Sequence, residues 1–173
     1  MDFELNDDEV ALQEGVRKLC EGRFPMERVR AAQEHAGVER DGWRELADAG
    51  VFALRIPEAD GGVGLGMTEA VLVFEELGRA LVPGPVLGSH LAAGLVDGAS
   101  DGSRVVGMVD TRDTPVILEH LHGLDVVLAI DDGGLRAIDP GAIETLFLIP
   151  VMVVTFALQK YLLRGVTFGT IKR

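Results

Sequence analysis

The hydrophobic pattern of the chain changes once, from a helical period to a strand period, and this change restricts the possible folds. Before residue 98 the apolar residues recur every three or four positions, whereas strand-like runs occupy 105–109, 116–118, 125–130 and 135–138. Helices followed by strands favour a helical unit joined to a β unit over an alternating α/β sheet. The predicted fold class is therefore α+β, with an N-terminal helical bundle, a small incomplete antiparallel β region and a terminal apolar helix.

About five helices are expected in the helical part. Asn6 and Glu9 have the spacing of a capping box, so the first helix should begin directly after Asn6. The helix that contains the tryptophan should end at Gly50, because glycine commonly takes the left-handed conformation after a helix. Thr68 is the expected N-cap of a long helix, and residues 89–96 are expected to form a short one.

Charge is distributed unevenly along the chain. The net charge of −12 includes one acid and four bases in the last 31 residues, which leaves −15 for residues 1–142. An acidic balance excludes nucleic acid as a partner, because binding a polyphosphate requires a basic surface. Together with the change of period, this predicts three domains: a helical domain over 1–98, a partial β region over 99–142 and an apolar, basic-ended helix over 143–173.

The single cysteine and the acidic N-terminus indicate the cellular compartment of the protein. Cys20 has no second cysteine with which to form an internal bridge, and the first nine residues carry five acids and no basic residue of a signal peptide. Both features predict a reducing, cytoplasmic location. Cys20 itself falls on the apolar face of the first helix and should be a small buried side chain.

A glycine-rich loop with the sequence GGVGLG begins at Gly61 and follows the apolar segment 51–57, which reads as a short strand. A strand, a glycine loop and a helix in this order can bind a phosphate at the helix N-terminus. No basic residue stands nearby, however, and Glu58 and Asp60 would repel a phosphate. A turn that requires unusual backbone angles is the favoured interpretation.

His120 and His122 have strand spacing, which would place both imidazoles on one face of a strand. Two histidines are too few for a metal site, and the sequence shows no third ligand. We therefore predict no metal site.

The helical part resembles a known family. The opening MDFELNDDEVALQEGVRKL and the stretch WRELADAGVFALRIPEADGGVGLGMTEAVLVFEELGRALVPGP are similar to the N-terminal helical domain of acyl-CoA dehydrogenases. The features that carry the resemblance are a tryptophan helix, a glycine stop, Pro57-Glu58, the glycine-rich loop and a helix that ends in Glu75 to Arg79. The strand region through Ile138 resembles, more weakly, the middle β-domain of the same family.

The resemblance implies an oligomeric flavoprotein that removes hydrogens from the α and β carbons of an acyl-CoA, with FAD as hydride acceptor. It implies acyl-CoA as ligand, and association with itself or with a full-length dehydrogenase. In relatives a C-terminal helical domain supplies the catalytic glutamate, so we name no catalytic residue and no FAD ligand, and we expect a truncated form without activity. The non-catalytic alternative is a subunit or pseudoenzyme domain. Candidates for lining the acyl pocket are Val86, Leu87, His90 and Leu91, with plain helix packing as the alternative for each.

Residues 143–173 differ in composition from the rest of the chain. The run 145–158 is uncharged and almost wholly apolar, and it extends to about residue 163 if Gln159 and Lys160 reach an interface. A bilayer-spanning helix needs about twenty residues. The run therefore predicts either a buried helix or membrane contact through residues 145–163, which would place the chain at or in the inner membrane.

Residues 143–173 also resemble a known sequence, the extreme C-terminus of the permease subunits of sugar ABC transporters. The similarity lies in Ile149-Pro150, Phe156 to Tyr161, Arg164-Gly165 and Gly169 to Lys172. Residues 1–140 thus resemble a dehydrogenase, whereas residues 143–173 resemble a permease. We therefore predict that the chain is a chimera, joined near residue 140 by a frameshift, a rearrangement or an assembly error. A tail-anchored, permease-derived product is the alternative.

Overall fold

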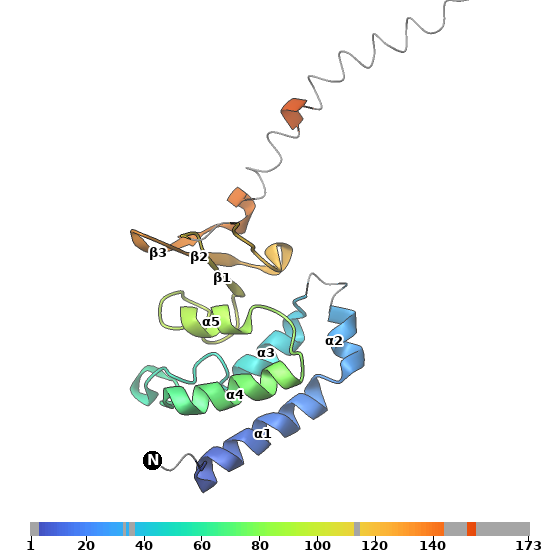
Figure 1. Ribbon diagram of the computed structural model, residues 1–173, viewed down its shortest axis with the longest axis vertical. Coiled ribbons are helices and arrows are strands. Elements are labelled where there is room, and N and C mark those ends of the chain that lie inside the picture. The colour runs from blue at the N-terminus through green and yellow to red at the C-terminus, as the bar shows by residue number, and fades with distance from the viewer. Residues whose placement is uncertain (1–3, 33, 35–36, 113–114, 144–151, 155–173) are drawn as a thin grey trace, which may run out of the picture. The chain divides into compact units, whose positions relative to one another are not determined.

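The computed structural model describes residues 4–143, except 33, 35–36 and 113–114, and residues 152–154. The chain divides into two compact units, residues 1–138 and 139–173. Five helices and three strands of the first unit are drawn in Figure 1: α1 (Asp7–Arg23), α2 (Met26–Ala32), α3 (Arg40–Asp48), α4 (Met67–Arg79), α5 (Val86–Ala92), β1 (Val106–Asp110), β2 (Val126–Asp131) and β3 (Gly134–Ile138). Two short 3-10 turns, η2 (Glu58–Asp60) and η3 (Leu121–Gly123), lie between them. The mixed helical and β composition that the sequence predicted is confirmed.

The capping box predicted at the start of α1 is present. The backbone N–H of Glu9 donates to Asn6 Oδ1 at 2.8 Å, and the backbone N–H of Asn6 donates to Glu9 Oε2 at 2.8 Å. Two of the donors that a helix N-terminus leaves without intrahelical partners are thereby satisfied. Cys20 is buried, as predicted.

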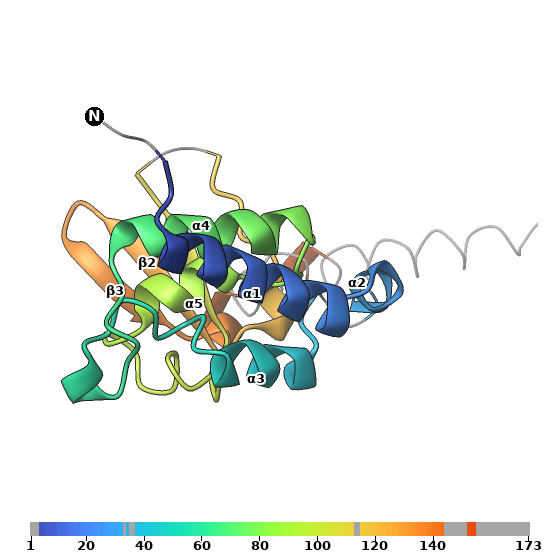
Figure 2. The same ribbon diagram turned by 90° about the horizontal axis from the view of Figure 1, so that it is seen from below.

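α1 lies along α4, as Figure 2 shows, and a buried carboxylate joins the two helices. Glu76 of α4 is 2% exposed and accepts two hydrogen bonds from the guanidinium of Arg17 in α1, at 3.0 and 2.8 Å. Arg79 donates a third at 3.2 Å. The guanidinium of Arg17 holds the pKa of Glu76 below its usual value, although burial acts in the opposite direction.

The core of the helical unit surrounds Trp43 of α3. Its indole packs against Phe52 with ring centroids 4.7 Å apart, and both residues are buried. Gly84 has φ +99° and lies against the same indole, because a Cβ at this position would be 2.8 Å from Trp43 Cζ3. A residue without a side chain is therefore required where the chain between α4 and α5 passes the tryptophan.

α5 is held to β1 by one side chain. Ser89 Oγ donates to the backbone carbonyl of Val106 at 3.2 Å and accepts from the backbone N–H of Val106 at 2.9 Å. The neighbouring Gly88 permits this approach, because a Cβ there would be 2.7 Å from the Val106 oxygen. The helix thus lies directly on the edge of the sheet.

The sheet has the order β1-β2-β3 and is mixed, which corrects the prediction of an antiparallel region. β1 and β2 are parallel, with Val106 paired to Val126, and β2 and β3 are antiparallel, with Asp131 paired to Gly134. A long connection through residues 111–125 returns the chain to the start of the sheet before β2, and parallel pairing requires such a connection. The hairpin expected between 125–130 and 135–138 is present.

Four local expectations are wrong. Residues 116–118 form no strand; they are extended and largely exposed, with Ile117 75% exposed. The segment 51–57 is a series of turns, in which the Ala53 N–H donates to the Gly50 carbonyl at 3.1 Å. Helix α4 begins at Met67 rather than after Thr68, because Glu69 accepts from the Gly66 N–H at 3.0 Å. The helix expected over 89–96 is α5, which begins three residues earlier, directly after Pro85.

The second unit is described only in part. Residues 140–143 and 152–154 are helical. Most of the predicted terminal apolar helix, the permease-like tail and the membrane-contact segment 145–163 lie outside the described residues. Within the part that the structure describes, no helix has the length and apolar character needed to cross a membrane.

Candidate functional site

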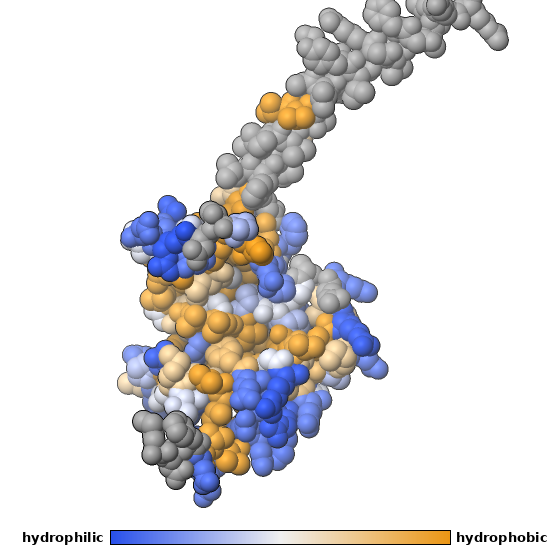
Figure 3. Space-filling model, viewed as in Figure 1, coloured by the Kyte–Doolittle hydropathy of each residue, from blue (hydrophilic) through white to orange (hydrophobic). Residues whose placement is uncertain are grey.

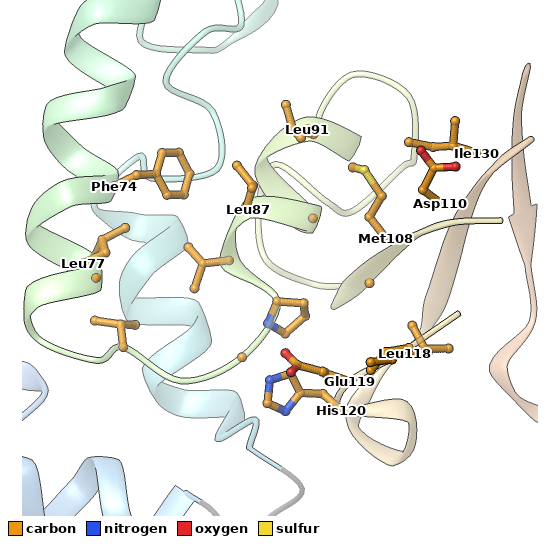
Figure 4. A pocket seen from close by; sticks show the side chains of 18 residues that line it. Phe74, Leu77, Leu87, Leu91, Met108, Asp110, Leu118, Glu119, His120 and Ile130 are labelled. Carbon is orange, nitrogen blue, oxygen red and sulfur yellow. The ribbon is translucent and has the colours of Figure 1, made fainter. Parts of the chain in front are cut away.

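A pocket of about 750 Å³ lies between the helices and the sheet of the first unit (Figure 4). One wall comes from α4, α5 and the turn between them, and the other comes from β1, β2 and the segment before η3. Most of the lining is apolar, and its larger side chains are Phe74, Leu77, Val82, Val86, Leu87, Leu91, Met108, Ile117, Leu118 and Ile130. Its volume lies in the range of about 300–1,000 Å³ that is usual for small-molecule sites.

The helical wall follows from the local sequence of α5. Pro85 fixes the backbone just before the helix begins at Val86. Leu87 and Leu91 are four residues apart and lie on one face, and Figure 4 shows both on the pocket side of the helix. Leu87 is 56% exposed and Leu91 43%, so two large apolar side chains are presented to the pocket rather than packed in the core.

Three of the four candidate residues, Val86, Leu87 and Leu91, line this pocket. The fourth, His90, does not. It lines a neighbouring groove of about 510 Å³, together with Leu87 and Leu91. Their role in acyl binding stays a prediction.

His90 is 7% exposed and held in place. Its Nδ1 is 3.2 Å from the backbone carbonyl of Val51, and its ring meets Phe74 edge-on with centroids 5.0 Å apart. Burial lowers the pKa of His90, the Val51 carbonyl acts in the opposite direction, and the charge of Arg55 lowers it further. Because a carbonyl oxygen can only accept, Nδ1 carries the proton of the hydrogen bond to Val51.

The sheet wall of the pocket was not predicted from the sequence. Met108 and Ile130 reach the pocket from adjacent strands, and Phe74 reaches it from α4. Apolar residues in short strands give no sign of which cavity they face, because that depends on how the sheet meets the helices. Phe74 and Leu77 were recognisable from the apolar spacing of α4, but only as core.

The backbone of β1 adds hydrogen-bonding capacity to this wall. The Thr111 N–H donates to the Ile130 carbonyl at 2.9 Å, so the odd-numbered residues of β1 direct their backbone groups to β2. Val106, Met108 and Asp110 direct theirs to the opposite edge, where Ser89 takes those of Val106. Met108 and Asp110 line the pocket, so the edge of β1 that faces away from β2 lies beside it.

Two acidic side chains line the pocket at separate places. Asp110 forms an ion pair with Arg112, whose hydrogen bonds lower the pKa of that carboxyl to about 2. Glu119 lies beside His120, apart from Asp110, as Figure 4 shows. The pocket therefore combines apolar walls with carboxylates, which disfavour a polyphosphate inside it.

The two histidines of the sequence analysis do not lie on a strand. His120 has φ +60° and immediately precedes the turn η3, which contains His122. In the described ranges, no group of three metal-binding side chains comes together.

The glycine-rich loop is a turn with unusual backbone angles, as predicted. Gly61 has φ +82° and Gly64 φ +73°. Its backbone donors are used internally, since the Gly64 N–H donates to the Ile56 carbonyl at 2.9 Å and the Leu65 N–H to the Leu54 carbonyl at 2.8 Å. Amides that are already bonded cannot hold a phosphate, so the phosphate interpretation has no support in the geometry.

Comparison with known proteins relates the helical unit to one family. The family described as "Acyl-CoA dehydrogenase, N-terminal domain" matches residues 6–101. Acyl-CoA dehydrogenase IpdE2 of Mycolicibacterium smegmatis is 43% identical over 90 residues, which is 51% of this chain and 29% of that protein. Benzylmalonyl-CoA dehydrogenase of Aromatoleum aromaticum is 35% identical over 79 residues, which is 46% of this chain and 21% of that protein.

Solved structures extend the similarity to the sheet. The ChsE4-ChsE5 complex from Mycobacterium tuberculosis matches with a TM-score of 0.60 and 22% identity, over 82% of this chain and 49% of that chain. PigA with FAD and proline matches with a TM-score of 0.57 and 14% identity, over 80% and 49%. Identities this low support the fold alone. The chain spans about half of these solved chains and less than a third of the curated relatives.

The comparisons bear only on the front of the chain. The family match ends at residue 101, and the permease resemblance of residues 143–173 stays a prediction. The chimera that this resemblance implied gains no support from the comparisons.

Proposed function

The chain belongs to the acyl-CoA dehydrogenase family through its N-terminal domain, and from this we propose that its first unit, residues 1–138, binds an acyl-CoA thioester. The acyl group would occupy the pocket of about 750 Å³ between α4, α5 and the sheet. The reaction that we propose for the whole protein is α,β-dehydrogenation of that thioester.

The observation that carries the proposal is the composition of the two pocket walls. Leu87 and Leu91 on α5 face Met108 and Ile130 on the sheet, with Phe74 behind the leucines. Burying one methylene of a ligand contributes about 0.8 kcal/mol, so a cavity lined in this way favours an alkyl group over a polar one. The acyl-pocket roles of Val86, Leu87 and Leu91 are part of the proposal, and that of His90 is limited to holding Phe74 from behind.

The family reaction takes a proton from the α carbon and a hydride from the β carbon, and FAD supplies the acceptor for the hydride. We propose FAD as the cofactor of the whole protein but derive no step through it. The pyrophosphate of FAD does not fit the residues described here, because the carboxylate of Glu119 lines the pocket and the amides of the glycine-rich loop are bonded internally. We assign no catalytic base among the described residues.

We also propose that the protein works as an oligomer, either with itself or with another dehydrogenase subunit. The support is indirect: the ChsE4-ChsE5 match is a complex of two proteins. A cytoplasmic location remains part of the proposal and rests on the buried, free Cys20.

The binding proposal is tested by titrating the full chain with octanoyl-CoA and, separately, with CoA in a calorimeter. Burial of only two methylenes contributes about 1.6 kcal/mol, so octanoyl-CoA should bind at least about tenfold more tightly than CoA. Equal affinities would show that the acyl group has no pocket in this chain.

Two variants connect the affinity to the pocket. Met108→Gln changes the sheet wall and should weaken octanoyl-CoA binding severalfold, with little effect on CoA. Leu95→Gln is the matched control, because Leu95 is 63% exposed and lines neither this pocket nor the neighbouring groove. Equal effects of the two substitutions would contradict the assignment. If octanoyl-CoA binds but is not oxidised when the chain is mixed with other dehydrogenase subunits and FAD, the chain acts as a non-catalytic subunit.

A further inference from the structure

A second hollow lies beside the acyl pocket and has its own chemistry. This α4–α5 groove has a volume of about 510 Å³ and shares Phe74, Leu87 and Leu91 with the acyl pocket. Its other members do not touch the acyl pocket, and they are Arg55, Met67, Ala70, Val71, Glu75 and His90. Substitutions at Arg55 or Val71 therefore alter the groove alone.

The sides of the groove are large apolar side chains left in contact with solvent. Met67 is 58% exposed, Val71 57%, Leu87 56% and Leu91 43%. Figure 3 shows apolar residues gathered over α4 and α5 on this face. A contiguous exposed apolar patch on a small domain indicates a binding surface rather than chance exposure.

One cation at the groove, Arg55, has no acidic partner among the residues that the structure describes. The exposed guanidinium of Arg55 forms no ion pair with any residue that the structure describes. The carboxylate of Glu75 also lines the groove, but Arg79 binds it at 2.6 Å and balances its charge. The charge of Arg55 reaches the buried end of the groove, where it lowers the pKa of His90.

An apolar groove with one unpaired cation matches a ligand that has one apolar part and one negative charge. We propose that the α4–α5 groove binds a medium-chain alkyl carboxylate, with its alkyl chain against Val71, Leu87 and Leu91 and its carboxylate on Arg55. A single anion is favoured over a polyanion because Arg55 is the one arginine or lysine among the residues that line the groove. The proposal rests on the groove alone and does not depend on the dehydrogenase reaction.

The test is a titration of the full chain with sodium octanoate, and with 1-octanol as the uncharged probe of the same length. Arg55→Gln should weaken octanoate binding at least about threefold and leave 1-octanol binding unchanged, since one partly exposed ion pair is lost. Octanoate binding to the original chain should also weaken as NaCl rises, because salt screens the pair. Val71→Ser should weaken both probes.

Arg44→Gln is the matched control, because Arg44 is exposed on α3 and lines none of these cavities. Both groove residues are exposed, so the variants should keep the circular dichroism spectrum and melting temperature of the original chain. Octanoate binding that is unchanged in Arg55→Gln overturns the proposal. So does binding that is lost in Met108→Gln and retained in Val71→Ser, which would place octanoate in the acyl pocket.

A second copy of the chain is the other occupant that the test distinguishes. Sedimentation velocity should show the same oligomeric state for the original chain and for Val71→Ser. A dimer that this substitution dissociates and that octanoate does not affect would identify the groove as a contact between copies, and would overturn the proposal.

Discussion

Arg40 and Asp125, 85 positions apart in sequence, form a two-pronged ion pair that ties α3 to the start of β2. Arg40 Nη1 lies 2.5 Å from Asp125 Oδ2, and Nη2 lies 3.0 Å from Oδ1. The same carboxylate accepts the backbone N–H of Val105 at 2.7 Å, one residue before β1 begins. The carboxylate of Asp125 thus connects a helix with the starts of two strands.

Removal of this charge should loosen the connection between the helices and the sheet. We expect Asp125→Asn to lower the free energy of unfolding by about 1 kcal/mol, a figure reduced because both side chains are partly exposed. Urea denaturation measures the change. Asp97→Asn, at an exposed position, should leave stability unaltered. An equal loss in the two variants would mean that the Arg40 pair contributes nothing beyond surface charge.

Ser89 should be indispensable to the contact between α5 and β1. In Ser89→Ala the buried backbone N–H and carbonyl of Val106 lose their partner, and we expect a loss of about 1–3 kcal/mol. Amide hydrogen exchange at Val106 should become faster than at Val127, which pairs inside the sheet. Ser100→Ala provides the control. Unchanged exchange at Val106 would contradict the bonding described here.

Gly84 should resist substitution more strongly than another glycine of similar backbone angle. Gly84→Ala combines a positive φ with a Cβ 2.8 Å from the Trp43 ring, whereas Gly94 has φ +83° with open space around it. Overpacking costs about 1–3 kcal/mol, so Gly84→Ala should be the less stable variant by about that amount. Since the chain has one tryptophan, its fluorescence reports the disturbance directly. Equal stability of the two variants would show that the indole can move aside.

Stability should fall on mild acidification because of His90. Burial lowers its pKa in the folded state, so the unfolded chain binds the proton more readily. The contribution of the neutral imidazole is fully present above the unfolded pKa of about 6.5 and is lost as the pH falls through the lower, folded pKa. Melting temperatures measured from pH 8 to pH 5 should decrease less in His90→Gln than in the original chain.

The sequence was sufficient where structure depends on neighbours along the chain. The box of Asn6 and Glu9, the left-handed Gly50 that follows α3 and the turn at Gly61 are all local, and all were predicted. Strand direction was not predicted, because parallel pairing of β1 and β2 depends on where the connection of residues 111–125 runs, and that path includes Asp125 bound to the distant Arg40.

The same division holds for the candidate site. Leu87 and Leu91 could be named from the sequence, since their spacing and the preceding Pro85 define a helix face. Arg55 could not be distinguished from other exposed arginines, because its importance depends on which acids lie near it in space. His90, named with them, lines the neighbouring groove instead, because adjacent helix positions face different sides of the helix, and its role in acyl binding stays a prediction.

The bond pair between Ser89 and Val106 also bears on aggregation. An exposed strand edge is a template on which another chain can add a strand, and natural sheets need a way to prevent this. Here a serine hydroxyl takes the place of a strand residue at the first position of β1, and α5 blocks the approach of any longer segment. A mutation that detaches α5 would therefore do more than lower stability, because it would open this edge to uncontrolled growth of the sheet from chain to chain.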